Sequence, residues 1–345
     1  MPSRSISIIN CGPDPIAIGS RCFDRFMQIP QFLYPKEALP LQALNDGINR
    51  DYLFQCLVVL VDNVPAGRCA LYKNPLLRHH EKSCIAIGNY ECTDDAEVSA
   101  ALLNEAKKLA KEAGAQLLIG PLNGSTWDAY RFDTQPGKDL FFLEPYHLPH
   151  YAKQFEAAGF STLADYVSTI DRTLAHDAPA VLKREKEFLD QGFRFRHILL
   201  DEYESELDRL YVFCRRAFAK NFLYTPVSRE VFFNKYKTIK PFIKEEQVII
   251  VEFPNGKTAG FVFCFHDHAC RTEKRLVLKT LARDPSPETK GLGNVLGNRM
   301  TKYAAGNGYA SIIHALMHVD NSSKNLSGQY SGEPLKQYKL YSLSL

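Results

Sequence analysis

Apolar positions recur along this chain with two different spacings, and together the two spacings predict a mixed α/β fold. Alternating or continuous apolar runs rich in β-branched residues are typical of strands, whereas apolar residues three and four positions apart are typical of helices. In the first part of the chain, the predicted strands cover residues 5–11, 54–61, 66–72, 83–91, 116–119 and 162–170. The predicted helices cover residues 96–113 and 151–158, after a helical and aromatic-rich segment that extends to about residue 52.

The second part of the chain repeats this order of elements. Its predicted strands cover residues 193–199, 247–253, 258–266, 276–281 and 310–316, and its predicted helices cover residues 204–219, 228–236 and a last helix that ends near residue 307. No close sequence repeat accompanies the repeated order, so the evidence for duplication is the order alone. We expect two domains, residues 1–172 and 192–345, joined by a linker over residues 173–191.

A loop with two glycines separates the strand at residues 276–281 from the helix that follows it. The loop ends in Thr289, Lys290, Gly291, Leu292, Gly293 and Asn294. Glycines at the start of a helix let backbone N–H groups approach an anion, and the helix dipole favours negative charge there. The loop is therefore a candidate pyrophosphate site, and the open alternative is a simple strand-to-helix turn.

Composition narrows the class of protein. The net charge of the 345 residues is only +3, which argues against nucleic-acid binding as the main activity. No apolar stretch approaches the ~20 residues of a membrane span, and no apolar run follows a basic start, so we expect a cytoplasmic protein without a membrane partner. The nine cysteines show no C-x-x-C pair and several fall within apolar strands, which predicts buried thiols in a reducing compartment rather than a disulfide framework.

With these elements in place, the chain resembles the GNAT superfamily of acyl-CoA N-acyltransferases in a tandem arrangement. The pyrophosphate loop of that family usually reads [Gln/Arg]-x-x-Gly-x-[Gly/Ala], and Gly291 and Gly293 match its small positions. Glu288 stands where the family places Gln or Arg, and Lys290 is the candidate for the missing positive charge. The first half also carries the family's Glu-x-x-Gly-Phe signature, at residues 156–160.

A narrower resemblance is to a poorly characterised bacterial set of GNAT-related proteins. Its pieces are Phe26, Pro30, Leu33, Tyr34, Gly67, Arg68, residues 90–95, residues 120–126, Tyr338, Leu340 and Tyr341. The individual motifs are loose, but their shared order covers most of the chain. This resemblance implies two GNAT-like domains and says little about the substrate.

The resemblance implies an N-acyltransferase that uses acetyl-CoA or another acyl-CoA as co-substrate and needs no metal. The residues that would bind this co-substrate are Leu281, Ala282, Arg283, Thr289, Lys290, Gly291, Leu292, Gly293, Asn294 and Asn321. The first three would lie beside the pantetheine arm like an added strand. The expected partner is a small-molecule amine acceptor, and a homodimer is left open.

The candidate catalytic residues are Tyr330 and His318. A tyrosine near its unperturbed pKa of ~10 can donate a proton to a departing thiolate, and a histidine can act as a base. Packing under the last strand is the alternative for Tyr330, and His314, within a strand, is expected to be a core histidine. The polar and aromatic loop with Asn123, Ser125, Thr126 and Trp127 follows a buried strand, so we expect it to line the acceptor pocket or simply to be anchored by the indole.

Two further groups of polar residues have patterns that resemble ligand sites. Glu91, Asp94, Asp95 and Glu97 occupy the place of the glycine loop in the first half, and these acids would repel a pyrophosphate. The first domain is therefore expected to be degenerate as a cofactor site. Cys264, His266 and His268 would share one face of a strand, but a zinc site usually draws ligands from separate elements, so we expect no metal there.

Two other functions remain open from the sequence. A protein that binds CoA or another small molecule but has lost catalysis would be consistent with Glu288 in the loop. A FemABX-like transferase, which resembles tandem GNAT domains and takes an aminoacyl group from tRNA, is disfavoured by the weak basic charge and by the retained glycine loop.

Overall fold

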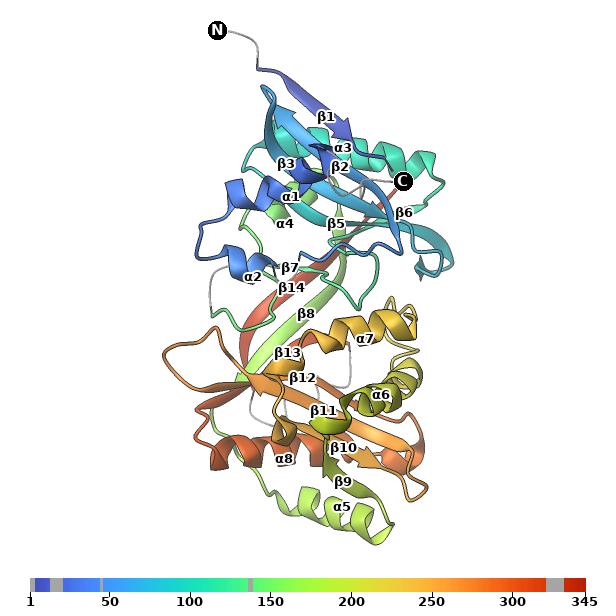
Figure 1. Cartoon of the computed structure of the whole chain (residues 1–345), viewed down its shortest axis with the longest axis vertical. Coiled ribbons are helices and arrows are strands. Elements are labelled where there is room, and N and C mark those ends of the chain that lie inside the picture. Colours follow the sequence, from blue (N-terminus) through green and yellow to red (C-terminus); the bar gives the residue numbers. More distant parts are fainter. Residues whose placement is uncertain (1–3, 13–20, 44–45, 136–138, 321–331) are drawn as a thin grey trace.

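The computed structural model describes residues 4–12, 21–43, 46–135, 139–320 and 332–345. Figure 1 shows an elongated molecule whose helices and strands gather in two groups, one toward each end of the long axis. The long strands β8 (Ser161–Asp171) and β14 (Glu333–Ser344) run between the two groups. The first half of the chain forms most of one group and the second half forms most of the other.

The first half contains the strands that the apolar alternation predicts, with two short additional ones. The elements are β1 (Ile6–Asn10), α1 (Arg21–Leu33), α2 (Leu39–Ala43), β2 (Leu53–Val61), β3 (Val64–Tyr72), β4 (Arg78–His79), β5 (Lys82–Cys92), α3 (Ala96–Glu112), β6 (Leu117–Gly120), β7 (Phe132–Asp133), α4 (Tyr151–Ala157) and β8. Asp62 and Asn63 join β2 to β3 with φ values of 49° and 67°. Two successive positive φ values match the twist of a tight hairpin.

The second half follows the predicted order from α6 onward. Its elements are α5 (Pro179–Asp190), β9 (Arg194–His197), α6 (Tyr203–Ala217), α7 (Arg229–Lys237), β10 (Val248–Glu252), β11 (Thr258–His266), β12 (Arg275–Arg283), α8 (Leu292–Gly306), β13 (Ser311–His318) and β14, with 3₁₀ turns at Leu200–Glu202, Lys240–Phe242, Glu245–Gln247 and Pro287–Thr289. The segment expected as a linker contains α5. Phe188 of α5 is fully buried in a cluster with residues of α8, so this helix is a packed part of the second half.

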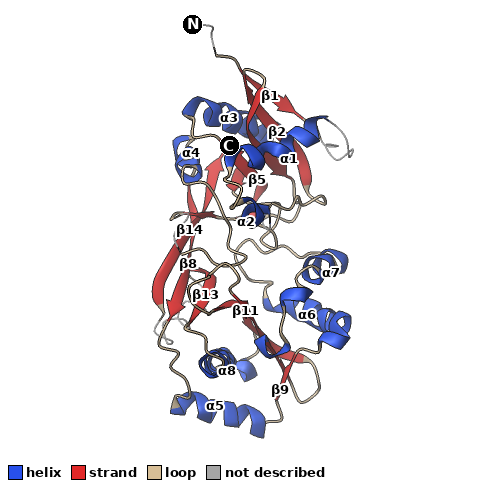
Figure 2. Cartoon of the chain, turned by 60° about the vertical axis from the view of Figure 1, so that its left-hand side comes forward, coloured by secondary structure: helices blue, strands red, loops and turns tan. Residues whose placement is uncertain are grey.

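Within the described residues, 14 strands join into one continuous sheet that spans both halves. The strand order is β1-β2-β3-β5-β6-β14-β8-β13-β12-β11-β10-β9, with β4 beside β5 and β7 beside β14. Figure 2 shows this run of strands from one end of the molecule to the other. Two neighbouring pairs are parallel, β5 with β6 and β12 with β13, and each is joined through a helix, as parallel pairs require.

The centre of the sheet is shared between the halves. β14 comes from the end of the chain but pairs with β6 and β8 of the first half, and β8 pairs in turn with β13 of the second half. The division of the chain at residues 172 and 191 stays a prediction, but β14 lies across it. The sequence did not predict this exchange.

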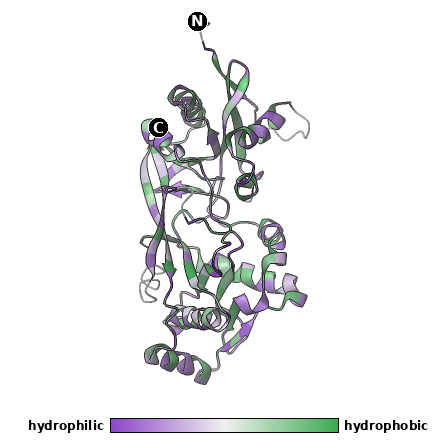
Figure 3. Cartoon of the chain, turned by 90° about the vertical axis from the view of Figure 1, so that its left-hand side faces the viewer, coloured by the Kyte–Doolittle hydropathy of each residue, from purple (hydrophilic) through white to green (hydrophobic). Residues whose placement is uncertain are grey.

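Helices cover both faces of the sheet in both halves. In the first half, α3 and α4 pack on one face and α1 on the other. In the second half, α6 and α7 pack on one face, while α5 and α8 pack on the opposite face. Figure 3 shows hydrophilic and hydrophobic colour on most helices, as expected for amphipathic helices that cover a sheet.

The cysteines follow the sequence prediction with one exception. Six of the seven free cysteines are buried. Cys11 and Cys22, however, form a disulfide, which the sequence did not predict because the two lie in separate elements without a recognisable spacing. No helix in the described part of the chain is long and apolar enough to cross a lipid bilayer.

Candidate functional site

The parallel strands β12 and β13 separate halfway along their length. Their first paired residues are Arg275 and Ser311, and their last are Leu278 and His314. After this last pair the two strands are no longer paired with each other. Beyond that point β12 continues to pair with β11 on its other edge, while β13 pairs with β8. The edge of β12 at Leu281, Ala282 and Arg283 therefore faces the gap between the two strands, which leaves backbone groups available to an extended ligand.

A β-bulge marks the place where the strands separate. Cys264 of β11 pairs with Leu278, but its neighbour Phe263 pairs with Thr280. Lys279 is thus the extra residue of β12, opposed by no residue of β11. A bulge bends the strand and changes which way its side chains face.

Helix α8 begins beside the carboxyl end of β12, and its first two amides, those of Leu292 and Gly293, have no partner within the described residues. Gly291 precedes the helix with φ of +90°, a conformation that favours glycine, and no side chain caps the helix. The N–H groups of Asn294 and Val295 both donate to the carbonyl of Gly291, at 3.1 and 3.3 Å. The N–H groups of Leu292 and Gly293 remain at the positive end of the helix dipole, which suits an anion.

The loop residues predicted to bind the cofactor differ in their exposure and in their hydrogen bonds. Lys290 is exposed and Gly293 is half-buried, whereas Leu292 is fully buried, its backbone included. Thr289 is also buried, and its hydroxyl donates to the carbonyl of Asp284 at 2.6 Å. Arg283 donates to that hydroxyl at 3.0 Å. The side chains of Thr289 and Arg283 therefore shape the loop.

Arg184 of α5 is a residue of this site that sequence reasoning missed. Its Nε donates to the carbonyl of Lys290 at 3.0 Å and one terminal nitrogen donates to the carbonyl of Glu288 at 3.3 Å. This guanidinium holds the loop from outside and places a positive charge beside it, where the sequence itself has the acid Glu288. The sequence predicts only a linker over residues 173–191, so nothing in it places this residue at the loop.

The close seating of α8 on the sheet depends on Gly260 of β11. A Cβ at this position would lie 2.8 Å from Leu292 Cδ2 and 2.9 Å from the carbonyl oxygen of Ala282. Overpacking of this kind costs typically about 1–3 kcal/mol. We expect Gly260→Ala to lower the free energy of unfolding by that amount in urea titrations. Gly306→Ala is the matched control, because a Cβ there meets nothing within 4 Å, and it should not destabilise the chain; equal effects of the two variants would contradict this account.

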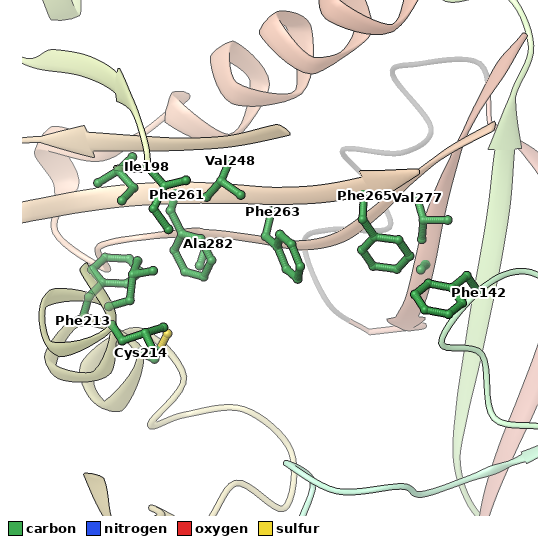
Figure 4. Packing of buried hydrophobic residues seen from close by; sticks show 14 of the residues in the cluster. Phe142, Ile198, Phe213, Cys214, Val248, Phe261, Phe263, Phe265, Val277 and Ala282 are labelled. Carbon is green, nitrogen blue, oxygen red and sulfur yellow. The ribbon is translucent and has the colours of Figure 1, made fainter. Parts of the chain in front are cut away.

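The opposite face of the sheet carries aromatic side chains of β11 and a group of charges near the bulge. Figure 4 shows Phe261, Phe263 and Phe265 along this face, with Phe213 and Cys214 of α6 below them. Trp127 packs against the same cluster, and its Nε1 donates to the carbonyl of Thr225 at 3.0 Å. This loop of the first half is therefore brought onto the second half.

The other residues of the predicted acceptor loop have internal partners. Asn123 is buried and accepts from the N–H of Asn89 at 2.9 Å. Ser125 is fully buried and donates to Asp128 at 3.0 Å. Thr126 is half-buried, like Trp127. Trp127 is thus the member of this set that the structure places against the second half.

The predicted catalytic residues are only partly described. Tyr330 and Asn321 lie outside the described residues. His318 ends β13, with its ring edge to face with Tyr166 and tilted against Phe222, at centroid distances of 5.0 and 5.2 Å. Its Nδ1 accepts from the N–H of Asp320 at 3.1 Å. Burial lowers the pKa of His314 to about 4, so this histidine is neutral at pH 7, as expected of a core residue.

Similar structures exist, although no protein-family model and no curated protein matches the sequence. A GCN5-related glucosamine N-acetyltransferase region of a fungal multi-domain β-N-acetylglucosaminidase matches 99% of this chain and 38% of its own, with a TM-score of 0.60 and 12% identity. A tandem GNAT protein of the clavulanic acid biosynthesis pathway matches over 99% and 98% of the two chains, with a TM-score of 0.52 and 12% identity. A GCN5-related N-acetyltransferase from Sphaerobacter thermophilus matches over 98% and 95%, with a TM-score of 0.52 and 10% identity.

The chain has the tandem GNAT fold. The mixed α/β sheet and the repeated order of elements, both predicted from the sequence, are confirmed by these neighbours. At this level of identity the likeness concerns the fold alone, so the activity has to be argued from the site.

The two GNAT-fold halves differ at equivalent places. In the first half, β5 and β6 also pair in parallel, from Cys84 with Leu117 to Ala86 with Ile119, and then separate. The chain itself fills this gap, because the bulged Asn89 of β5 donates its N–H to Asn123. The first amides of α3, at Glu97 and Val98, donate to the carboxylate of Asp95. At this place, the described residues of the first half therefore leave neither the edge of β5 at Asn89 nor the start of α3 open to a ligand.

The pattern of Cys264, His266 and His268 does not form a metal site. The rings of His266 and His268 lie 4.9 Å apart edge to face, while Cys264 is buried in the cluster on the α5 and α8 face. No group of three potential metal ligands occurs among the residues that the structure describes.

Proposed function

We infer that this protein is an acyl-CoA-dependent N-acyltransferase with one cofactor site, located between β12, β13 and the amino terminus of α8. The observation that carries this proposal is the uncapped start of α8 beside the gap between two parallel strands. The pyrophosphate of CoA would bind at the start of α8, where the N–H of Gly293 is available, with Lys290 as an additional cation. The pantetheine arm would lie along the free edge of β12 and hydrogen-bond with it as an added strand does.

The proposal gives the cofactor a direction. Its nucleotide end would lie on the α8 face of the sheet, and its thioester end would pass through the gap toward the face covered by α6 and α7. An acceptor amine would then approach from the side where Trp127 and the β11 aromatics lie. The acyl group is most simply acetyl, and the acceptor is a small-molecule amine.

Acetyl-CoA is expected to raise the melting temperature of the chain, and Gly291→Glu is expected to abolish the rise. A ligand at 100 times its Kd stabilises by about 2.7 kcal/mol, which corresponds to roughly 4 °C if the 345 residues unfold together. The glutamate would place a carboxylate at the pyrophosphate position. Differential scanning fluorimetry with millimolar acetyl-CoA measures the effect.

Gly308→Glu is the matched control for this variant. Gly308 follows the other end of α8, also has positive φ (+69°) and has open space around its Cβ position. It therefore adds the same charge at a glycine with positive φ without approaching the loop, and it should keep the acetyl-CoA response. It does not reproduce the contact with Arg184, whose Cγ would lie 3.3 Å from a Cβ at position 291. Release of free thiol from acetyl-CoA in the presence of amines then tests turnover. Absence of any thermal shift would refute the cofactor site, and binding without turnover of any amine would favour the CoA-binding protein that has lost catalysis.

A further inference from the structure

Lys279 occupies a distinctive position in this gap. It directly follows Leu278, the last residue of β12 to pair with β13, and it is the extra residue of the bulge against β11. Val277 and Ala282 pack in the cluster with α6 and α7, whereas Leu278 and Leu281 pack with α5 and α8. The bulge thus places Lys279 and Thr280 on the α6 and α7 face, at the point where the two strands part.

The surroundings of the Lys279 amine are mostly positive. Arg131 and Lys235 are close enough to disfavour its charged form, and Glu144 is the one acid that acts on it in the opposite direction. Glu144 already faces the ammonium of Lys336 at 3.0 Å and accepts from the hydroxyl of Tyr338 at 2.5 Å. Lys279 itself makes no hydrogen bond or ion pair with any residue in the described ranges.

The positive neighbours of Lys279 are held in place. Arg131 lies over the rings of Tyr130 and Tyr166, at 4.0 and 4.5 Å from their centroids, and donates to the carbonyl of Leu316 at 3.2 Å. Lys235 of α7 lies 3.5 Å from Asp128. Burial and these two cations lower the pKa of Lys279 to about 7, so a large fraction of this amine is neutral at neutral pH.

We propose that Lys279 is the general base of the acyl transfer, positioned by the bulge beside the thioester of a bound acyl-CoA. The proposal rests on the proposed function, because it requires that an acyl-CoA occupies the gap between β12 and β13. A base works best when its pKa lies near the working pH, and an acceptor amine needs such a base because its ammonium form has no lone pair for attack.

The reaction would transfer two protons from the nitrogen of the acceptor, one to Lys279 and one to the departing thiolate. The neutral Nζ of Lys279 takes one proton from the ammonium of the acceptor, and the freed amine forms a C–N bond to the thioester carbonyl carbon. The C–S bond then breaks, and the nitrogen of the adduct gives its second proton to the departing thiolate. Protonated Lys279 returns its proton to solvent, so that an ammonium and a thioester become an amide, a thiol and one released proton.

Competitive labelling of the intact chain tests the proposal without knowledge of the acceptor. A trace of isotopically labelled acetic anhydride is added between pH 5 and pH 11, and mass spectrometry follows the peptide that contains Lys279. Half-maximal reactivity is expected near pH 7, against ~10.4 for an unperturbed lysine, for which Nα-acetyl-lysine amide serves as the reference. Saturating CoA is expected to protect Lys279, because its thiol end would lie beside the amine.

The outcomes separate this proposal from the proposed function. If the reactivity of Lys279 with acetic anhydride is half-maximal only near pH 10, Lys279 is not the general base. Reactivity near pH 7 that CoA leaves unprotected, while CoA still raises the melting temperature, also overturns this role and leaves the cofactor site standing. A chain whose melting temperature does not respond to CoA overturns both.

Turnover with an amine that the thiol assay identifies supplies a second readout. Lys279→Met is expected to lower kcat by about 100-fold or more while the Kd for CoA stays unchanged. Lys279→Arg, which keeps the charge but cannot act as a base near neutral pH, should be equally impaired. In the wild type, kcat is expected to decrease below about pH 7, where Lys279 becomes protonated. In Lys235→Met this decrease should begin at higher pH, because removing a positive neighbour raises the pKa of Lys279. Wild-type kcat in Lys279→Met, or a decrease that begins at the same pH in Lys235→Met, would contradict the proposal.

Discussion

Lys336→Met is expected to lower the free energy of unfolding by about 3–5 kcal/mol at neutral pH. Lys336 lies on β14 with only 1% of its surface exposed, and its Nζ is 2.5 Å from Asp133 and 3.0 Å from Glu144. Both carboxylates are buried as well. Methionine fills a similar volume but leaves two acids without their cation, and an uncompensated buried charge is far more costly than the loss of an exposed pair. Urea denaturation measures the change.

The stability lost in Lys336→Met should depend on pH. Burial raises the pKa of Glu144 to about 7, so this acid is protonated at pH 5 and ionised at pH 8. The loss caused by Lys336→Met should therefore be smaller at pH 5 than at pH 8. Combining the variant with Glu144→Gln should recover part of the lost stability at pH 8, whereas the exposed Lys257→Met should change stability by less than ~0.5 kcal/mol. A loss below 1 kcal/mol at pH 8 would show that the three side chains do not act as a charged group.

Leu340→Ala is expected to destabilise both halves of the molecule together, by about 2–5 kcal/mol. Leu340 is fully buried in β14, within a cluster that contains strands of the first half. β14 pairs with β6 and β8, and β8 pairs with β13, so the loss should reach the second half through the shared strands. Hydrogen exchange measures this loss of stability: the amides of the β2–β3 hairpin and those of the β10–β11 hairpin should lose protection equally.

Leu189→Ala is the control for this experiment. Leu189 of α5 is 49% exposed, so its truncation removes little buried surface and should leave exchange in both hairpins nearly unchanged. If Leu340→Ala affects the β2–β3 hairpin alone, the two halves are independent folding units despite the continuous sheet.

Much of the fold was predictable because it is encoded locally. The apolar alternation of β2, β3, β10 and β11 and the helical spacing in α3 each lie within one stretch of sequence. β14 was not predicted, because what makes it a central strand is its pairing with β6 and β8 far upstream in the chain. Helix α5 lies within the predicted linker, and its packing was not predicted because Phe188 is buried against residues of α8 far downstream in the chain.

Some residues of the candidate site could be predicted from the sequence, and others could not. The glycine loop before α8 was visible in the sequence because Gly291 and Gly293 mark it locally. Arg184 and Lys279 were missed for a physical reason: one reaches the loop from α5, and the other acquires its position from the register of β12 against β11. Asn123, which is expected to line the acceptor pocket, accepts from the N–H of Asn89 in β5, a partner that only the fold brings close.

The shared strands also set the order in which this molecule can be completed during synthesis. Tyr341 of β14 pairs with Gly120 of β6, more than two hundred positions earlier in the chain. At roughly 5–20 residues per second, a ribosome leaves β6 without this neighbour for roughly 10–45 s. Until then the first half carries an open strand edge in the middle of its sheet, and it is among the last parts of the molecule to close, although it is the first to be made.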